Sequence, residues 1–170
     1  MTSYKNTVKV YRTHSNVKLP VRAHATDAGM DFFFCPPENV SITILPGETA
    51  LLSTGVKVQV PQGCMLQIMN KSGIASKKQL ITGACVVDEG YDGEIFVNLQ
   101  NIGKKDQTIP PGQKIAQGVF VRIERPSFVE VDEDKIYDKQ HSRGSGALGS
   151  TGDTRIPNVL RRRQRTGDSL

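Results

Sequence analysis

The 170-residue sequence contains no tryptophan, and aromatic residues make up only 6% of the chain. Its core must therefore be built mostly from valine, isoleucine and leucine, which favours strands over helices. No apolar run approaches the roughly 20 residues of a membrane-spanning helix, and the N-terminus lacks the apolar stretch of a secretory signal. These absences predict a cytoplasmic protein without a membrane partner, located in the host cytoplasm if its source is a virus.

Cysteine is also scarce. The three cysteines, Cys35, Cys64 and Cys85, show neither CxxC spacing nor the even number of a disulfide framework. A structural zinc site is not expected either, because such sites need clustered cysteine or histidine ligands. We interpret the three residues as small hydrophobic side chains that are buried or half-buried.

Positive charge is concentrated near the C-terminus. The formal net charge is +5, and five arginines with two aspartates in residues 153–170 account for +3 of it. The rest of the chain is too weakly basic to predict a nucleic-acid surface. The length fits one domain, so we predict a β domain over 1–141, a flexible glycine-rich arm over 142–152 and a basic, disordered tail over 153–170. An alternative for the tail is that Arg161 to Arg165 contacts nucleic acid or an acidic partner.

Apolar and polar residues alternate with a period of two in several short segments, the pattern of half-buried strands. The segments are Val8 to Val10, Val40 to Ile44, Val56 to Val60, Ile95 to Leu99 and Val119 to Ile123. Proline and glycine separate them, as tight reversals require. The pattern predicts an all-β protein, an antiparallel barrel or sandwich. Gly73 to Leu80 breaks the alternation and predicts one short helix.

Five short segments stand out between these strands: TDAGMD, KSGIASK, VVDEGYDGE, GQKIAQ and RGSGALGSTG. Together they resemble, in the same order, the five motifs of the trimeric dUTPase family, over about Val8 to Gly152. The resemblance implies the jelly-roll-like β-clip fold of that family. It also implies hydrolysis of dUTP to dUMP and diphosphate, which lowers dUTP and supplies dUMP for thymidylate synthesis. The implied assembly is a homotrimer with active sites at subunit interfaces.

The third segment resembles the hairpin that receives the nucleoside. Asp88 matches the family acid that orients and deprotonates the attacking water, and Tyr91 matches the ring that packs on the deoxyribose and rejects ribonucleotides. Main-chain groups of Gly83, Cys85 and Val87 match those that bind uracil, although Cys85 stands where the family usually has glycine. Taken without the resemblance, Asp88 and Asp92 are better interpreted as ordinary turn formers.

The first, second and fourth segments resemble the phosphate and metal motifs. Asp31 matches the acid that helps to hold Mg²⁺ through water, which fits the preference of Mg²⁺ for oxygen ligands. Lys71, Ser72 and Gly73 match phosphate-binding residues at the start of a short helix, where unpaired N–H groups favour anions. The alternative for Ser72 is a simple helix N-cap. Gln117 matches an amide donor to the phosphates.

The last segment resembles the flexible arm that closes over the substrate. Arg143 matches the residue that binds the γ-phosphate. Gly149, Ser150 and Thr151 match the anion cradle around it. Leu148 stands where the family places a phenylalanine over the uracil ring, so ring stacking, worth about 0.5–1.5 kcal/mol, is lost.

Two other functions stay open at this stage. A dCTP deaminase of the same fold would also bind a deoxynucleoside triphosphate, although Asp88, Tyr91 and the arm favour the pyrophosphatase. The second alternative is a weakly catalytic relative that acts as a regulatory or binding protein. It is motivated by four departures from the family motifs: Lys71, Cys85, Ala147 and Leu148.

Overall fold

The computed structural model describes residues 7–138. The chain divides into two units, one ending at Pro126 and the other beginning at Ser127, and each is described by itself. The predicted arm, the predicted tail and the boundary at residue 141 lie outside the described residues. Within residues 7–138, none of the helices is both long and apolar enough to cross a membrane.

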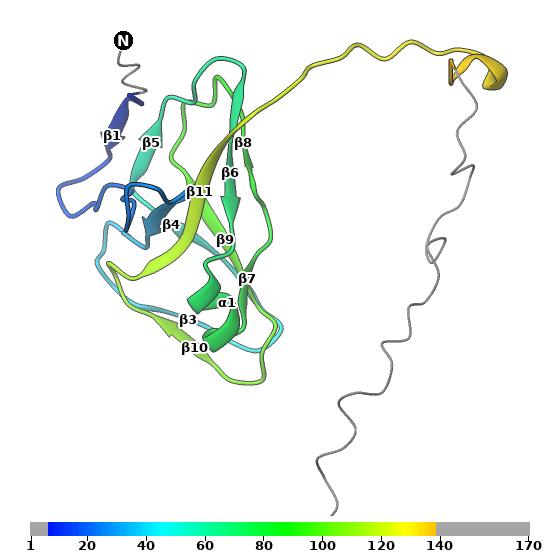
Figure 1. The fold of residues 1–170 in the computed structure, drawn as a ribbon. Helices are drawn as coiled ribbons and strands as arrows, with labels where there is room; N and C mark the ends of the chain where they lie inside the picture. The colour runs from blue at the N-terminus through cyan, green and yellow to red at the C-terminus, as the bar shows by residue number, and fades with distance from the viewer. Residues whose placement is uncertain (1–6, 139–170) are drawn as a thin grey trace, which may run out of the picture. The chain divides into compact units, whose positions relative to one another are not determined.

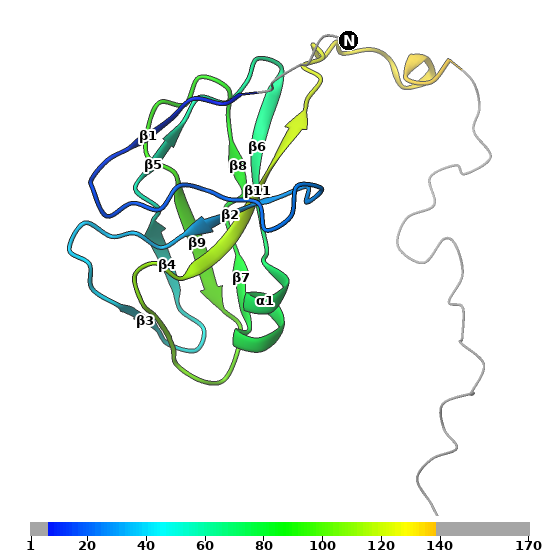
Figure 2. The same ribbon diagram turned by 60° about the vertical axis from the view of Figure 1, so that its left-hand side comes forward.

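The first unit is built from antiparallel strands, as the sequence predicts. Its largest sheet has the order β2-β11-β6-β8 and carries most of the residues discussed below. These strands are β2 (Met30–Phe33), β11 (Lys114–Arg122), β6 (Cys64–Met69) and β8 (Val86–Val87). Figure 2 shows β2 beside β11, with which it pairs.

A second sheet has the order β4-β9-β7, and two further pairs of strands complete the unit. The three strands of this sheet are β4 (Thr49–Ser53), β9 (Phe96–Asn101) and β7 (Leu80–Thr82). The two pairs are β1 (Val10–Arg12) with β5 (Val56–Val58), and β3 (Ile42–Ile44) with β10 (Gln107–Ile109). Each of the five predicted strand segments overlaps one of these strands, and the all-β prediction is confirmed.

Along the core strands, buried residues alternate with less buried ones at a period of two. In β9, Val97 and Leu99 are buried at 0% and 1% exposure, whereas Asn98 and Gln100 between them are only half-buried. The polar side chains of Asn98 and Gln100 therefore project from the opposite face of the strand, and both approach Gly83. The apolar face of the sheet builds the core while the polar face borders the predicted uracil hairpin.

A β-bulge in β11 decides which side chains meet at the site. Lys114 pairs with Phe33, but Ala116 already pairs with Phe32, so Ile115 is the extra residue. In a regular strand, residues three positions apart point to opposite faces. The extra residue places Lys114 and Gln117 on the same face, because Gln117 pairs with Asp31.

The predicted helix is confirmed as α1 (Ser72–Lys78), which ends where Gln79 adopts a left-handed conformation with φ of 54°. The N–H group of Gln79 then donates to the carbonyl of Ile74, which satisfies part of the last turn. In the second unit, a short 3₁₀ helix, η1 (Glu133–Lys135), was not predicted from the sequence.

Candidate active site

A buried carboxylate shared by two lysines forms the centre of the predicted phosphate region. Asp31 has a side chain that is 8% exposed, and its two oxygens accept from Lys71 Nζ and Lys114 Nζ, each at 2.7 Å. Burial acts to raise the pKa of Asp31, but the hydrogen bonds and positive charges of Lys114 and Lys71 outweigh it and lower that pKa. We call these three residues the lysine–aspartate cluster.

The charge around this cluster is positive. Two ammonium groups share one carboxylate, which leaves a net charge of +1 on the cluster. Lys18 adds a further cation. Its Nζ lies 5.7 Å from the centre of the Phe33 ring, and Lys114 Nζ lies 5.9 Å from the same centre. Such an arrangement attracts a polyanion, and the low pKa of Asp31 keeps the cluster ionised at neutral pH.

Asn70, which adjoins the second motif, contacts the fourth motif and the end of β7, the strand that leads into the predicted uracil hairpin. Its carbonyl accepts from Gln117 Nε2 at 2.9 Å. Its side-chain oxygen accepts from the backbone N–H of Thr82 at 2.7 Å and from the Thr82 hydroxyl at 3.0 Å. Gly29 leaves room for Gln117, because a Cβ at that position would lie 2.5 Å from Gln117 Oε1. Asn70 thus fixes the second and fourth motifs relative to β7 and the hairpin that follows it.

The beginning of α1 suits an anion. The N-cap residue is Lys71, which makes no side-chain cap hydrogen bond, and no acidic residue lies in the first turn. Ser72 is the first residue of the helix, so the alternative that Ser72 is the N-cap is wrong. The first N–H groups of a helix carry partial positive charge when no side chain satisfies them.

The hairpin begins at a glycine that no other residue can replace without a shift. A Cβ on Gly83 would lie 2.2 Å from Asn98 Oδ1 and 2.5 Å from Gln100 Nε2. The backbone N–H of Gly83 donates to the carbonyl of Asn98 at 3.0 Å. The carbonyl of Cys85 is engaged as well, because it accepts from the N–H of Ile68 at 2.7 Å. These bonds hold the predicted uracil strand against both neighbouring strands.

A tight turn follows β8 and carries the two most specific predicted residues. The N–H of Tyr91 donates to the carbonyl of Asp88 at 3.2 Å, and Gly90 between them has φ of +88°, which a type II turn requires at its third position. Asp88 is exposed. The Tyr91 hydroxyl donates to the carbonyl of Glu94 at 2.9 Å, and its ring covers Gly93, where a Cβ would lie 2.3 Å from the hydroxyl. The ring therefore has a defined position.

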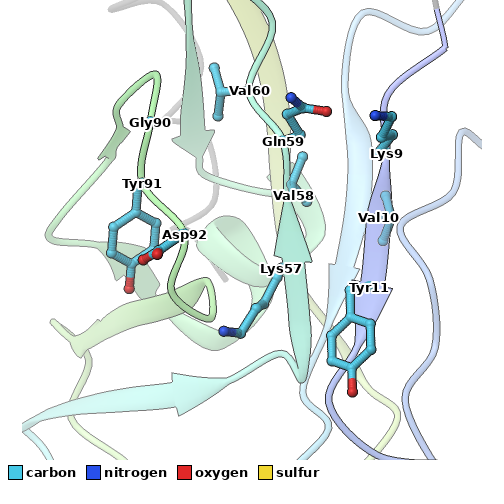
Figure 3. Close-up of a pocket in the computed structure, with 10 residues that line it drawn as sticks. All are labelled: Lys9, Val10, Tyr11, Lys57, Val58, Gln59, Val60, Gly90, Tyr91 and Asp92. Carbon is cyan, nitrogen blue, oxygen red and sulfur yellow. The ribbon is translucent and has the colours of Figure 1, made fainter.

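A hollow of about 440 Å³ lies beside this turn. Figure 3 shows it between the turn at Gly90, Tyr91 and Asp92 and the strands β1 and β5, with Lys57 and Tyr11 on the opposite wall. Of the predicted substrate residues that lie within 7–138, Tyr91 alone lines it. The hollow is therefore not assigned to the predicted nucleotide, whose other predicted contacts in residues 7–138 lie on the hairpin and at the lysine–aspartate cluster.

Among residues 7–138, no group of three or more histidine, cysteine, aspartate or glutamate side chains is arranged to hold a metal ion. Both oxygens of Asp31 are engaged by lysines. The described residues therefore do not form a protein cage for Mg²⁺, and the indirect role of Asp31 stays a prediction.

The structure brings Asp31, Lys71, Ser72, Gly73 and Gln117 together at one end of the β2-β11-β6-β8 sheet. It places the hairpin residues along β6 in the same sheet. Five predicted residues lie outside the described residues: Arg143, Leu148, Gly149, Ser150 and Thr151.

Sequence reasoning did not single out Asn70 or Lys114, although each adjoins or lies within a recognised motif. Asn70 directly precedes Lys71, and Lys114 lies three residues before Gln117. These positions are the sequence signal that could have identified both residues as part of the site. Their partners, however, lie far away in the chain.

Comparison with known proteins identifies relatives of this chain. The family model described as dUTPase matches residues 15–152. The chain is 41% identical over 117 residues to the deoxyuridine 5'-triphosphate nucleotidohydrolase of Chlamydia trachomatis, a match that covers 68% of this chain and 79% of the relative. It is 36% identical over 154 residues to the protein of that name from Clostridium tetani, with 89% and 99% covered.

Solved structures give the same result. The dUTPase of Staphylococcus bacteriophage 80alpha with dUPNHPP matches with a TM-score of 0.79 and 27% identity, covering 87% of this chain and 99% of that one. A variant dUTPase from phage phi11 of S. aureus, whose structure reveals the coordination of a structural Mg(II) ion, matches with a TM-score of 0.69 and 28% identity, covering 75% and 98%. The chain therefore belongs to the dUTPase family.

Proposed function

We propose that this chain hydrolyses dUTP to dUMP and diphosphate, and thereby lowers dUTP and supplies dUMP for thymidylate synthesis. The observation that carries the proposal is the meeting of the motif residues in one sheet, in a chain that matches the dUTPase family over residues 15–152. The curated relatives carry the name of this activity.

In the proposed mechanism, Asp88 holds a water molecule in line with the α-phosphorus and accepts its proton. Free aspartate is a weak base at neutral pH, so most of the barrier lowering must come from positioning and from cationic donors on the phosphates. Lys71, the N–H groups at the start of α1 and Gln117 are the proposed phosphate donors. The Tyr91 ring, held over Gly93, would leave no room for a 2′-hydroxyl group.

The spacing along β6 supports active sites shared between subunits. Val87 pairs with Leu66, so Asp88 lies near the level of Met65, whereas Lys71 follows the other end of the strand. Figure 1 shows β8 along one part of β6 and α1 beyond its opposite end. At roughly 3.3 Å per residue, Met65 and Lys71 are about 20 Å apart along the strand direction.

A base and a phosphate donor act on the same triphosphate only from hydrogen-bond distance, about 2.6–3.2 Å. The linked phosphates of one nucleotide are too close together to bridge the gap along β6. We therefore propose that Asp88 of one copy and Lys71 of another complete each site, in a homotrimer to which a third copy adds its arm. Arg143, Leu148, Gly149, Ser150 and Thr151 of that arm are the proposed contacts to the γ-phosphate and the uracil.

Mg²⁺ is proposed as the cofactor because the family is generally Mg²⁺-dependent and a similar phage enzyme has a structural Mg(II) ion. When bound, the ion would neutralise charge on the phosphate oxygens. The cytoplasmic location and the contact of the Arg161 to Arg165 segment with nucleic acid or an acidic partner stay predictions.

A diphosphate-release assay with dUTP, dCTP, dTTP and UTP, each with Mg²⁺, tests the proposal. We expect turnover of dUTP well above that of the other three. Asp88→Asn should lower kcat for dUTP about 100-fold or more, because general bases contribute about 10²–10⁴-fold. Asp106→Asn, at an exposed aspartate of a distant loop, is the matched control. If Asp88→Asn hydrolyses dUTP as fast as the unmodified chain, the proposed role of Asp88 is wrong.

The same assay separates the alternatives. Ammonia released from dCTP, without diphosphate from dUTP, would identify a deaminase. Negligible turnover of every nucleotide would favour the regulatory relative. Size-exclusion chromatography with light scattering tests the trimer. Mixing Asp88→Asn chains with Lys71→Ala chains, each first shown to have low activity alone, tests the shared sites. Mixed trimers should regain activity if the two residues come from different copies.

A further inference from the structure

The turn that carries Asp88 has little support from the sheet. Strand β8 is only two residues long, and its pairing with β6 ends at Val87. Residues 88–94 then cross to β9 without strand structure. On one side of this turn lies the hollow of Figure 3, so β1 and β5 do not pack against it there. The far end of this segment is held by Glu94, whose Oε1 accepts from Ser53 Oγ and from the backbone N–H of Gly55. The end that carries Asp88 needs a separate anchor.

Glu89 supplies an anchor. Its Oε2 accepts from the backbone N–H of Gly63 at 2.9 Å and from Arg125 Nη2 at 2.7 Å. The side chain of Glu89 is 29% exposed and that of Arg125 is 56% exposed. The hydrogen bond from Gly63, followed by that from Arg125, lowers the pKa of Glu89, so the carboxylate is charged and both bonds are present at neutral pH.

The anchor point belongs to the rigid part of the sheet. Gly63 lies in the turn between β5 and β6, with φ of +70°, and its carbonyl accepts from the N–H of Ile123 at 3.1 Å, just beyond the end of β11. The N–H and the carbonyl of Gly63 thus connect to different elements. Arg125 follows β11 by only a few residues. Through these two donors, Glu89 connects the turn to the ends of the two longest strands of the main sheet.

The position of Glu89 within the turn makes this connection relevant to the chemistry. Asp88 and Tyr91 are the first and fourth residues of the turn, and Glu89 is the second. Fixing the second residue fixes the direction in which the chain leaves Asp88. Asp88 is exposed, so its carboxylate follows the backbone rather than a packed environment.

We propose that Glu89 is a positioning residue for Asp88, which holds the catalytic turn against the Gly63 turn and Arg125 so that the Asp88 carboxylate keeps its place behind the α-phosphorus. This inference rests on the proposed function of Asp88. Glu89 itself touches neither substrate nor water in this role. A displacement of about 1 Å at a reacting group can cost about 100-fold in rate, so loss of the anchor should appear in kcat rather than in binding.

The test compares three variants with the unmodified chain, in steady-state hydrolysis of dUTP with Mg²⁺. Glu89→Ala should lower kcat about 10–100-fold and change KM by less than about threefold. The kcat of Glu89→Gln should lie between those of Glu89→Ala and the unmodified chain. Its amide oxygen can still accept from Gly63, but the ionic contact to Arg125 is lost. Glu124→Ala removes an exposed glutamate next to Arg125 and should leave both constants unchanged.

Hydrogen exchange of the backbone amides in residues 88–93 supplies a structural readout, and should be faster in folded Glu89→Ala than in Glu124→Ala. If Glu89→Ala fails to fold, Arg125→Gln takes its place, because Arg125 is mostly exposed. For this variant a fall in kcat of about threefold or more supports the proposal, and an unchanged kcat overturns it.

Failure of this inference is distinguishable from failure of the proposed function. If the unmodified chain does not hydrolyse dUTP, the proposed function fails. If it hydrolyses dUTP and depends on Asp88, but folded Glu89→Ala keeps kcat within about twofold, the anchoring role of Glu89 is wrong. A rise in KM as large as the fall in kcat would also overturn it, because Glu89 would then act on substrate binding.

Discussion

Replacement of Asp31 by asparagine should destabilise the folded protein in a pH-dependent manner. The change keeps the shape of the side chain and removes its charge. Lys71 Nζ and Lys114 Nζ both lie 2.7 Å from the carboxylate, which is 8% exposed. Without the negative charge, the two ammonium groups repel each other. The amide also offers one acceptor oxygen in place of the two that accept from them in the unmodified chain.

The magnitude follows from the two ionic hydrogen bonds. Each charge-assisted bond contributes about 1.5–3 kcal/mol when buried. Solvent screens part of this, because Lys71 is 32% exposed and Lys114 is 40% exposed. We therefore expect the free energy of unfolding to fall by about 1–3 kcal/mol at pH 7. The melting temperature should fall by about 2–4 °C for each kcal/mol.

The pH dependence gives the sharper test. The folded protein holds the pKa of Asp31 below its ordinary value of 3.8, which the unfolded chain retains. A depressed folded pKa stabilises the protein above the unfolded value, and this stabilisation is lost as the pH falls through the folded pKa. The difference between the unmodified chain and Asp31→Asn should therefore stay constant from about pH 7 to pH 5, and shrink below about pH 4.

Urea unfolding at matched protomer concentration, from pH 7 down to pH 3, measures this difference, with Asp106→Asn as the control. Matched concentration is needed because the stability of an oligomer depends on it. Lys114→Met, alone and combined with Asp31→Asn, completes a double-mutant cycle, with an expected coupling of about 0.5–3 kcal/mol. Equal stability of Asp31→Asn at pH 7, or a difference that does not shrink by pH 3, would show that the two ion pairs of Asp31 do not stabilise the fold.

Three further changes test other parts of the structure. Gly118→Ala should lower the free energy of unfolding, measured in urea, by about 1–3 kcal/mol, because its Cβ would lie 2.5 Å from the ring of buried Phe32. Unchanged stability would show that the ring can move away. Tyr91→Phe removes the hydrogen bond to the Glu94 carbonyl, so kcat/KM for dUTP divided by kcat/KM for UTP should fall by up to about tenfold. An unchanged ratio would mean that the hydroxyl does not fix the ring. Leu148→Phe should lower KM for dUTP by up to about tenfold through ring stacking, and an unchanged or higher KM would contradict the placement of Leu148 over uracil.

Much of the fold could be predicted from local patterns. The reason why some strands were not predicted is also local. Segments with regular alternation, such as β5 and β9, were found because one face of each strand is buried. Strand β8 has two residues and β2 four, too few for a period to be visible. The bulge at Ile115 also makes two adjacent residues of β11 buried, so the alternation there is interrupted.

The sequence alone was enough to predict the order of the five motifs, the short helix that begins in the second of them and the presence of glycine where the turn of the hairpin needs positive φ. These are local properties, because a motif, a helical period and a turn residue depend on neighbours a few positions away. The family and the identity of the proposed base follow from them.

Only the tertiary structure decided which charges meet. Asp31 is 40 residues from Lys71 in the chain, and Glu89 is 36 residues from Arg125. These contacts depend on strand register and on one bulge, and a shift of a single residue would turn the side chains to the other face of the sheet. The separation of Asp88 from Lys71 along β6 has the same origin, since it depends on which strands pair and at which residues.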